Sequence, residues 1–245
     1  MKEININKAE IISDGFMFKN TVLERIMVDN LKKVNDYFLS LNSKVREFNA
    51  PNLELIGNYF MQFNTSLNKL FLPRVREIGA AFLNVNSKLS VLEFPELVII
   101  DIGFLENCNS LRKIDLPSVI SINNEFCMHA DNLSEINIPN VIEIGNNFLL
   151  TNDRLTKIEA PNVIVIGDNF CKNSTSIVEV NLPKLVVAGQ DFLKSNLALT
   201  QINLPNIKYV EDNFLFNNRS ITDASLGYLE VLPTGFMFNN RFLKK

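Results

Sequence analysis

The sequence predicts a parallel-strand solenoid, because two residue types recur through it with one fixed spacing. Proline returns every 22 residues in eight successive units, and phenylalanine returns with the same spacing in eleven. A unit this short cannot bury its own apolar side chains, so neighbouring units must stack to form one continuous core. We therefore expect a right-handed coil of about eleven 22-residue units, with parallel β-strands and short helical or 3-10 turns.

The two columns set the register of the whole chain. The prolines are Pro51, Pro73, Pro95, Pro117, Pro139, Pro161, Pro183 and Pro205. The phenylalanines are Phe16, Phe38, Phe60, Phe82, Phe104, Phe126, Phe148, Phe170, Phe192, Phe214 and Phe236. This register predicts one solenoid domain over 1–245, with repeats 1–22, 23–44, 45–66, 67–88, 89–110, 111–132, 133–154, 155–176, 177–198, 199–220 and 221–242, and 243–245 as the start of a truncated repeat. At a strand spacing of roughly 4.8 Å, the stack would be about 50 Å long.

Each unit begins with a strand that ends at its proline. Leu133, Ile136 and Ile138 precede Pro139 with the spacing of an extended segment whose inward side chains are apolar. Because proline cannot donate to a strand ladder, it ends the pairing.

The second half of each unit predicts a shorter strand and a turn. Val141 and Ile144 indicate the short extended segment, and Gly145 indicates the turn. Asn146 is expected to cap a short helical turn that carries Phe148. The phenylalanine column should be the most buried set of side chains in the chain.

A further column is filled mostly by asparagine. We expect its side-chain amides to form a ladder that bonds the turn backbone of adjacent coils. Its members are Asn20, Asn42, Asn64, Asn86, Asn152, Asn196, Asn218 and Asn240.

Composition and charge argue against several classes of protein. Hydrophobic residues make up 47% and charged residues 21% of the chain, which is typical of a folded domain. The net charge is −3 and Lys and Arg never form a run longer than two, which argues against nucleic acid as a partner. The chain begins without an apolar secretory signal and contains no run of 18 apolar residues that could insert into a membrane.

Catalytic, metal-binding and cofactor motifs are not evident. His129 is the single histidine and is expected in a solvated turn with no nucleophile beside it. Cys127 and Cys171 each follow a phenylalanine of the column, so we expect two buried thiols, two coils apart and too distant for a disulfide. We therefore expect no enzyme activity and no cofactor.

The repeat LxxIxLPxVxxIGxxF resembles the leucine-rich repeats of the BspA-like bacterial family, and the resemblance covers essentially the whole chain. It implies a leucine-rich-repeat solenoid that serves as a binding scaffold for a protein partner. It also implies an extracellular or cell-surface location, as in secreted or wall-attached proteins of this family that meet host proteins.

Two columns of the longer strand should face solvent. In the first, positive and negative charges alternate, which favours a solvated ladder of charges: Glu3, Arg25, Glu47, Lys69, Val91, Lys113, Glu135, Lys157, Glu179, Gln201, Asp223 and Lys245. The second is polar except at Met27 and Phe71: Asn5, Met27, Asn49, Phe71, Glu93, Asp115, Asn137, Glu159, Asn181, Asn203 and Ser225. Candidate partner-binding residues on this face are Met27, Glu47, Lys69, Phe71, Val91, Glu93, Lys113 and Asp115.

A second candidate surface lies three residues after the proline position. This column is charged toward both ends of the chain and aliphatic through five consecutive units: Val98, Ile120, Ile142, Ile164 and Val186. An apolar stripe with a charged rim is typical of an interface. The alternative is that the short strand rotates in these units and the column joins the core.

The sequence thus favours a binding module that presents its long parallel sheet to a macromolecular partner. The alternative is a structural spacer or self-assembly segment of a larger surface protein. Met1, Ile4 and Ile6 already fill inward positions, and Leu243 opens a further unit. Because neither end carries a polar cap, we expect either end-to-end self-association or flanking capping segments.

Overall fold

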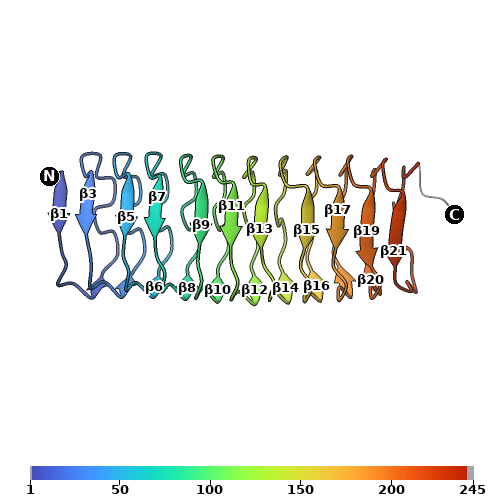
Figure 1. The fold of residues 1–245 in the computed structure, drawn as a ribbon, viewed down its shortest axis with the longest axis horizontal. Coiled ribbons are helices and arrows are strands. Elements are labelled where there is room, and N and C mark those ends of the chain that lie inside the picture. The colour runs from blue at the N-terminus through green and yellow to red at the C-terminus, as the bar shows by residue number, and fades with distance from the viewer. Residues whose placement is uncertain (1, 242–245) are drawn as a thin grey trace.

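The computed structural model describes residues 2–241 and is an elongated stack of coils that runs from β1 (Glu3–Asn5) at one end to β21 (Asp223–Leu226) at the other (Figure 1). Every strand pair is parallel and joins residues 22 positions apart, such as Ile114 with Ile136. This register confirms the predicted parallel-strand solenoid. The expectations for Met1, Leu243 and Lys245 lie outside the described residues.

Each coil carries a longer strand before the proline position. These strands are β1 (Glu3–Asn5), β3 (Arg25–Met27), β5 (Glu47–Asn49), β7 (Lys69–Phe71), β9 (Val91–Glu93), β11 (Lys113–Asp115), β13 (Glu135–Asn137), β15 (Lys157–Glu159), β17 (Glu179–Asn181), β19 (Gln201–Leu204) and β21 (Asp223–Leu226).

A two-residue strand follows the proline position in all coils but the last described one. These strands are β2 (Ile11–Ile12), β4 (Lys33–Val34), β6 (Leu55–Ile56), β8 (Glu77–Ile78), β10 (Ile99–Ile100), β12 (Ser121–Ile122), β14 (Glu143–Ile144), β16 (Val165–Ile166), β18 (Val187–Ala188) and β20 (Tyr209–Val210). They form one unbroken ten-stranded sheet.

The longer strands do not form the single long sheet that the sequence predicts. They divide into four groups, β1–β3, β5–β7, β9–β11–β13 and β15–β17–β19–β21. In an intact pair, the amide one residue before the strand donates to the preceding coil, as Asn68 N–H does to the Arg46 carbonyl at 2.8 Å. The equivalent amides of Arg46, Ser90 and Thr156 have no such bond, and these three residues mark the three breaks.

The third side of each coil consists of turns, and the expected helical turns are absent from residues 2–241. Left-handed residues occur at alternate positions, as at Asn147, Leu149 and Thr151 with φ of 60°, 51° and 56°. Their N–H groups donate alternately to the next and the preceding coil, as Leu149 does to the Phe126 carbonyl at 2.9 Å. These bonds between coils offset the strain of the left-handed backbone and leave no helical ladder.

Asn146 consequently does not cap a helix, as the sequence had suggested. Its Oδ1 accepts the N–H of Asp168 in the next coil at 2.8 Å, and the Asp168 Oδ1 in turn accepts the N–H of Gln190 at the same distance. The side chains at this position therefore link successive coils.

The phenylalanine column forms the centre of the core, as predicted. The rings stack face to face along the coil axis with centroids 5.2–5.8 Å apart. The members from Phe38 to Phe214 are at most 1% exposed, whereas Phe16 and Phe236 in the outermost coils are only partly buried.

The predicted asparagine ladder is also present. The Asn64 side chain donates to the Leu39 carbonyl and the Asn218 side chain to the Leu193 carbonyl, both in the preceding coil and both at 2.9 Å. Cys108 occupies the same column, and its thiol replaces the amide at the Leu83 carbonyl.

Candidate functional site

The face formed by the longer strands carries the ladder of charges that the sequence predicts. Lys69 pairs with Glu47 at 2.7 Å and Lys157 with Glu179 at 3.1 Å across neighbouring strands. The hydrogen bond and charge of Lys69 hold the pKa of Glu47 below its ordinary value. Because all four side chains are well exposed, each pair adds little to stability.

The candidate partner-binding residues lie on this face but do not form one cluster. Met27, Phe71 and Val91 are 44%, 55% and 50% exposed and belong to β3, β7 and β9. Phe71 and Val91 thus lie on opposite sides of the break between β7 and β9. Lys113 and Asp115 are half-buried on β11, farther along the stack.

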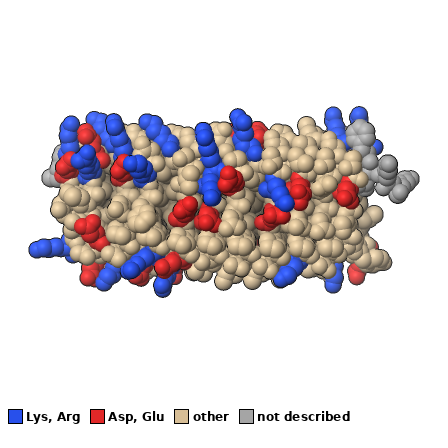
Figure 2. Space-filling view, viewed as in Figure 1, with Lys and Arg blue, Asp and Glu red and all other residues tan. Residues whose placement is uncertain are grey.

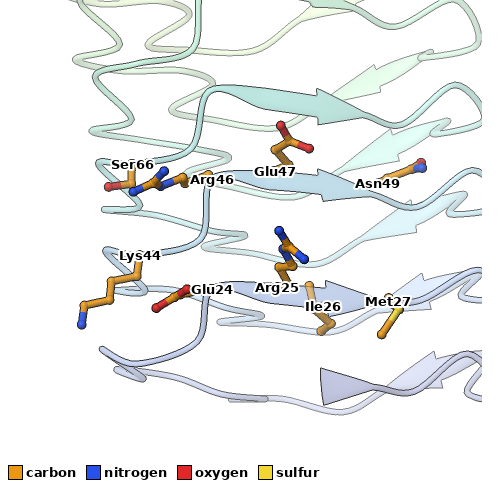
Figure 3. Close-up of a pocket in the computed structure, with 9 residues that line it drawn as sticks. All are labelled: Glu24, Arg25, Ile26, Met27, Lys44, Arg46, Glu47, Asn49 and Ser66. Carbon is orange, nitrogen blue, oxygen red and sulfur yellow. The ribbon is translucent and has the colours of Figure 1, made fainter. Parts of the chain in front are cut away.

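A groove of about 730 Å³ lies at the first break of this sheet, between β3 and β5. It is lined by Glu24, Arg25, Ile26, Met27, Lys44, Arg46, Glu47, Asn49 and Ser66, and we call it the β3–β5 groove. Figure 3 shows Glu24, Lys44 and Arg46 at the end where the strands begin, and Met27 and Asn49 at the opposite end. Of the predicted residues, the groove contains Met27 and Glu47.

In the β3–β5 groove the acidic side chains form ion pairs, but two of the basic side chains do not. Both acidic side chains pair with lysines outside the groove, Glu24 with Lys2 at 3.2 Å and Glu47 with Lys69 at 2.7 Å. Lys44 and Arg46 make no ion pair with any residue between 2 and 241. Figure 2 shows the corresponding gathering of basic side chains along one edge of the N-terminal coils.

Sequence reasoning missed Lys44 and Arg46 because it followed only the columns within the strands. The column one residue before the strand is charged at Arg46 and Arg112, with uncharged Asn68 and Ser90 between them. It shows that charge gathers in the first half of the chain, but it does not locate the groove.

A second groove, of about 450 Å³, lies at the break between β13 and β15. Its lysines, Lys113 and Lys157, are outnumbered by Asp115, Glu135 and Glu159, and Lys157 pairs with Glu159 at 2.8 Å. A smaller depression of about 320 Å³ covers the intact group β17–β19–β21. The β3–β5 groove has two cations without an ion pair in the described chain, Lys44 and Arg46, whereas the groove between β13 and β15 has one, Lys113, among three acidic residues.

The aliphatic stripe lies beside the ten-stranded sheet and faces solvent. Val98, Ile120, Ile142 and Ile164 are 38–48% exposed, and Val186 is half-buried. The alternative in which this column joins the core is therefore wrong. The inward positions of these coils are filled by the neighbouring residues Ile122, Ile144 and Ile166.

The histidine and the cysteines, which are the residue types most often used as catalytic bases and nucleophiles, do not line the grooves. His129 is half-buried and its Nδ1 lies 2.6 Å from the Thr151 hydroxyl oxygen. All three cysteines are buried and free, and burial raises the pKa of the Cys108 thiol to about 12. Burial also raises the pKa values of Cys127 and Cys171 well above the ordinary range, which makes these thiols poor nucleophiles.

Residues 2–241 form neither a cluster of metal ligands nor a membrane-spanning helix. This part of the chain contains no group of three His, Cys, Asp or Glu side chains placed to hold a metal ion. It also forms no helix with the length and apolar character needed to cross a lipid bilayer.

Several solved structures have a similar fold. A leucine-rich repeat protein from Bacteroides ovatus is 14% identical over 95% of this chain and 74% of its own, with a TM-score of 0.56. The pneumococcal vaccine antigen PcpA is 18% identical over 97% of this chain and 66% of its own, with a TM-score of 0.59. A leucine-rich cell surface protein from Faecalibacterium prausnitzii is 14% identical over 100% of this chain and 74% of its own, with a TM-score of 0.54. At these identities the likeness shows the fold alone.

No curated protein matches the sequence. The family model for the BspA type leucine-rich repeat region, which comprises six repeat copies, matches residues 1–90, 76–196 and 143–241. These matches cover nearly the whole chain and agree with the 22-residue coils of the structure. The chain therefore belongs to the BspA-type leucine-rich repeat family.

Proposed function

We propose that this solenoid is a protein-binding module and that the face of the longer strands meets the partner. The observation that carries the proposal is the contrast between the two strand layers. The ten-stranded sheet is unbroken, whereas the longer strands are interrupted and expose Met27, Phe71 and Val91 among charged residues. Exposed aromatic and methionine side chains are enriched in protein interfaces, so this face has the composition of a recognition surface.

The similar solved structures support a location at the cell surface for this module. One similar structure is a cell surface protein and another is a vaccine antigen, so a surface location fits the module. A partner at the surface would meet the broad, accessible face of the longer strands along the length of the stack (Figure 1).

Site-specific photo-crosslinking tests which face binds. A photoreactive residue replaces Phe71 on the proposed face, and a matched one replaces Tyr209, which is 57% exposed on the ten-stranded sheet. Crosslinking to a defined protein partner from the Phe71 position alone supports the proposal. Equal crosslinking from both positions, or crosslinking from Tyr209 alone, contradicts it.

The exposed aliphatic stripe favours a second candidate function, self-assembly. Ile120, Ile142 and Ile164 place 40–48% exposed side chains in three consecutive coils, and an apolar strip of this kind is an established mode of association. Ile142→Asp should then reduce the assembled mass measured by sedimentation while the melting temperature stays nearly constant. Unchanged sedimentation would contradict this role, and unfolding would show that Ile142 has a core function.

A further inference from the structure

We propose that the β3–β5 groove binds an acidic, extended peptide segment of the partner protein. This inference rests on the proposed binding function and deepens it, because it assigns the contact to one groove and to one chemistry. The two strand segments that line the groove lie in adjacent coils but belong to separate sheet groups. The groove therefore combines an interrupted strand ladder with a basic rim.

The interrupted ladder leaves main-chain groups open at the end of the groove where the strands begin. In the flanking pairs, Glu24 N–H donates to the Lys2 carbonyl at 2.7 Å and Asn68 N–H donates to the Arg46 carbonyl at 2.8 Å. Between these pairs, neither the Arg46 N–H nor the Glu24 carbonyl has a main-chain partner within residues 2–241.

The opposite end of the groove lacks the equivalent bond, but there the donor residue Val28 is fully buried and does not line the groove. In intact pairs, the residue after the strand donates to the next coil, as Ala50 N–H does to the Phe71 carbonyl at 3.1 Å. Across the break, the Val28 N–H and the Asn49 carbonyl lack this bond in the described chain. Only the end where the strands begin, formed by the exposed Glu24 and Arg46, therefore offers an unpaired acceptor and an unpaired donor that the main chain of an extended peptide can satisfy.

The charge of the groove selects an acidic segment. The carboxylates of Glu24 and Glu47 are already neutralised by Lys2 and Lys69, whereas Lys44 and Arg46 have no ion pair in the described chain. The Arg46 guanidinium can hold a carboxylate through two parallel hydrogen bonds, and Lys44 adds a second cation at the same end. At the opposite end of the groove, the exposed Met27 provides an apolar contact for another side chain of the segment.

The open main-chain groups favour a peptide over an anionic polysaccharide. A polysaccharide would meet the two cations equally well, but it lacks the regularly alternating N–H and carbonyl groups that match an interrupted strand ladder. The peptide therefore uses both features of the groove, whereas the polysaccharide uses only one.

Fluorescence anisotropy with a labelled (Glu-Val)₅ peptide tests the proposal on the full chain. The expected result is saturable binding that weakens about tenfold or more in Lys44→Gln/Arg46→Gln, because two charge-assisted contacts are lost. The matched control Lys33→Gln/Arg154→Gln removes one lysine and one arginine elsewhere, both exposed, and should bind like the wild type.

Two further probes separate the alternatives. The same peptide with alternate amides N-methylated keeps its charge but cannot donate along a strand, and it should bind about tenfold more weakly. Equal binding of the methylated peptide, or equal loss in both double variants, overturns the groove assignment. Heparin binding that requires Lys44 and Arg46, with no peptide binding, assigns the groove to a polysaccharide and also overturns it. Because the Phe71 crosslink does not involve the groove, it can succeed or fail independently.

Discussion

The two strand layers of this solenoid differ in continuity although they share the same coils. The short strands pair without interruption from β2 to β20, whereas the longer strands break three times. At β7 and β13, which border breaks, the inward residues Leu70 and Ile136 are only partly buried. At β11, within an intact group, Ile114 is fully buried. One strand layer, the stacked rings and the bonded turns hold the coils together, so the other layer can open locally and present grooves.

The largest expected effect comes from the ring stack that both layers enclose. Phe148 stacks between Phe126 and Phe170 at 5.2 and 5.3 Å and is fully buried. Phe148→Ala should lower the free energy of unfolding by about 3–5 kcal/mol, measured by denaturant titration. The control Phe71→Ala removes an exposed ring and should change it by less than about 0.5 kcal/mol. A loss below roughly 1 kcal/mol at Phe148 would contradict the role of the stack.

A second comparison measures how much a break weakens local packing. Ile114 and Ile136 occupy the same inward strand position in adjacent coils. Ile114 has a bonded strand on each side and is fully buried, whereas Ile136 borders a break and is only partly buried. Ile114→Ala should therefore cost about 3 kcal/mol, and Ile136→Ala about 1 kcal/mol less, by the same titration. Equal costs would show that the break does not loosen the core.

A substitution in the asparagine ladder on the turn side of the coils should have an intermediate effect on the free energy of unfolding. Asn218 donates to the Leu193 carbonyl at 2.9 Å and accepts the Asn196 N–H at 2.8 Å, entirely within the core. Asn218→Ala leaves two buried groups without partners, so we expect a loss of about 1–3 kcal/mol in unfolding free energy. Asn206→Ala, which removes an exposed bond to the Pro183 carbonyl, serves as the control and should be close to neutral.

The smallest expected effect depends on pH. Burial raises the pKa of Asp191, but hydrogen bonds from Lys172, Asn213 and Lys194 outweigh burial and leave the pKa below its ordinary value. A lowered pKa in the folded state stabilises the fold above the unfolded pKa of about 3.9, and this gain is lost as pH falls through the folded pKa.

Asp191→Asn should therefore be less stable than the wild type by about 1–2 kcal/mol at neutral pH, with the gap closing in strong acid. Denaturant titrations of both proteins across this pH range measure the gap. A gap of constant size would show that the Asp191 charge does not contribute.

The sequence predicted much of the fold because its period is unbroken. Fixed columns identified the Phe148 stack and the Asn64 ladder, since residues 22 apart must lie in register. The prediction of a helical turn was wrong. Residues such as Leu149 adopt left-handed conformations because their N–H groups bond to neighbouring coils, and the conformational preferences of single residues do not predict such bonds.

The candidate site was less predictable. Lys113–Asp115 lies in an intact group and Lys157–Glu159 borders a break, although both strands have the same pattern of charged and apolar residues. The pattern of charged and apolar residues in a single strand therefore does not show whether the strand borders a break. The column of Arg46 carries its charged residues in the first half of the chain, but it does not locate the groove.

Amide hydrogen exchange measured residue by residue tests the central claim, that one strand layer is broken while the other is continuous. The test compares the exchange rates of two amides within one coil, one at a break and one that is hydrogen-bonded beside the short strand. The three comparisons are Arg46 with Glu54, Ser90 with Val98, and Thr156 with Ile164. The account predicts that the first member of each pair exchanges at least about a hundredfold faster than the second. Slow exchange at Arg46, Ser90 and Thr156, equal to that of Asn68 in an intact pair, would show that the longer strands form one sheet and would contradict the account.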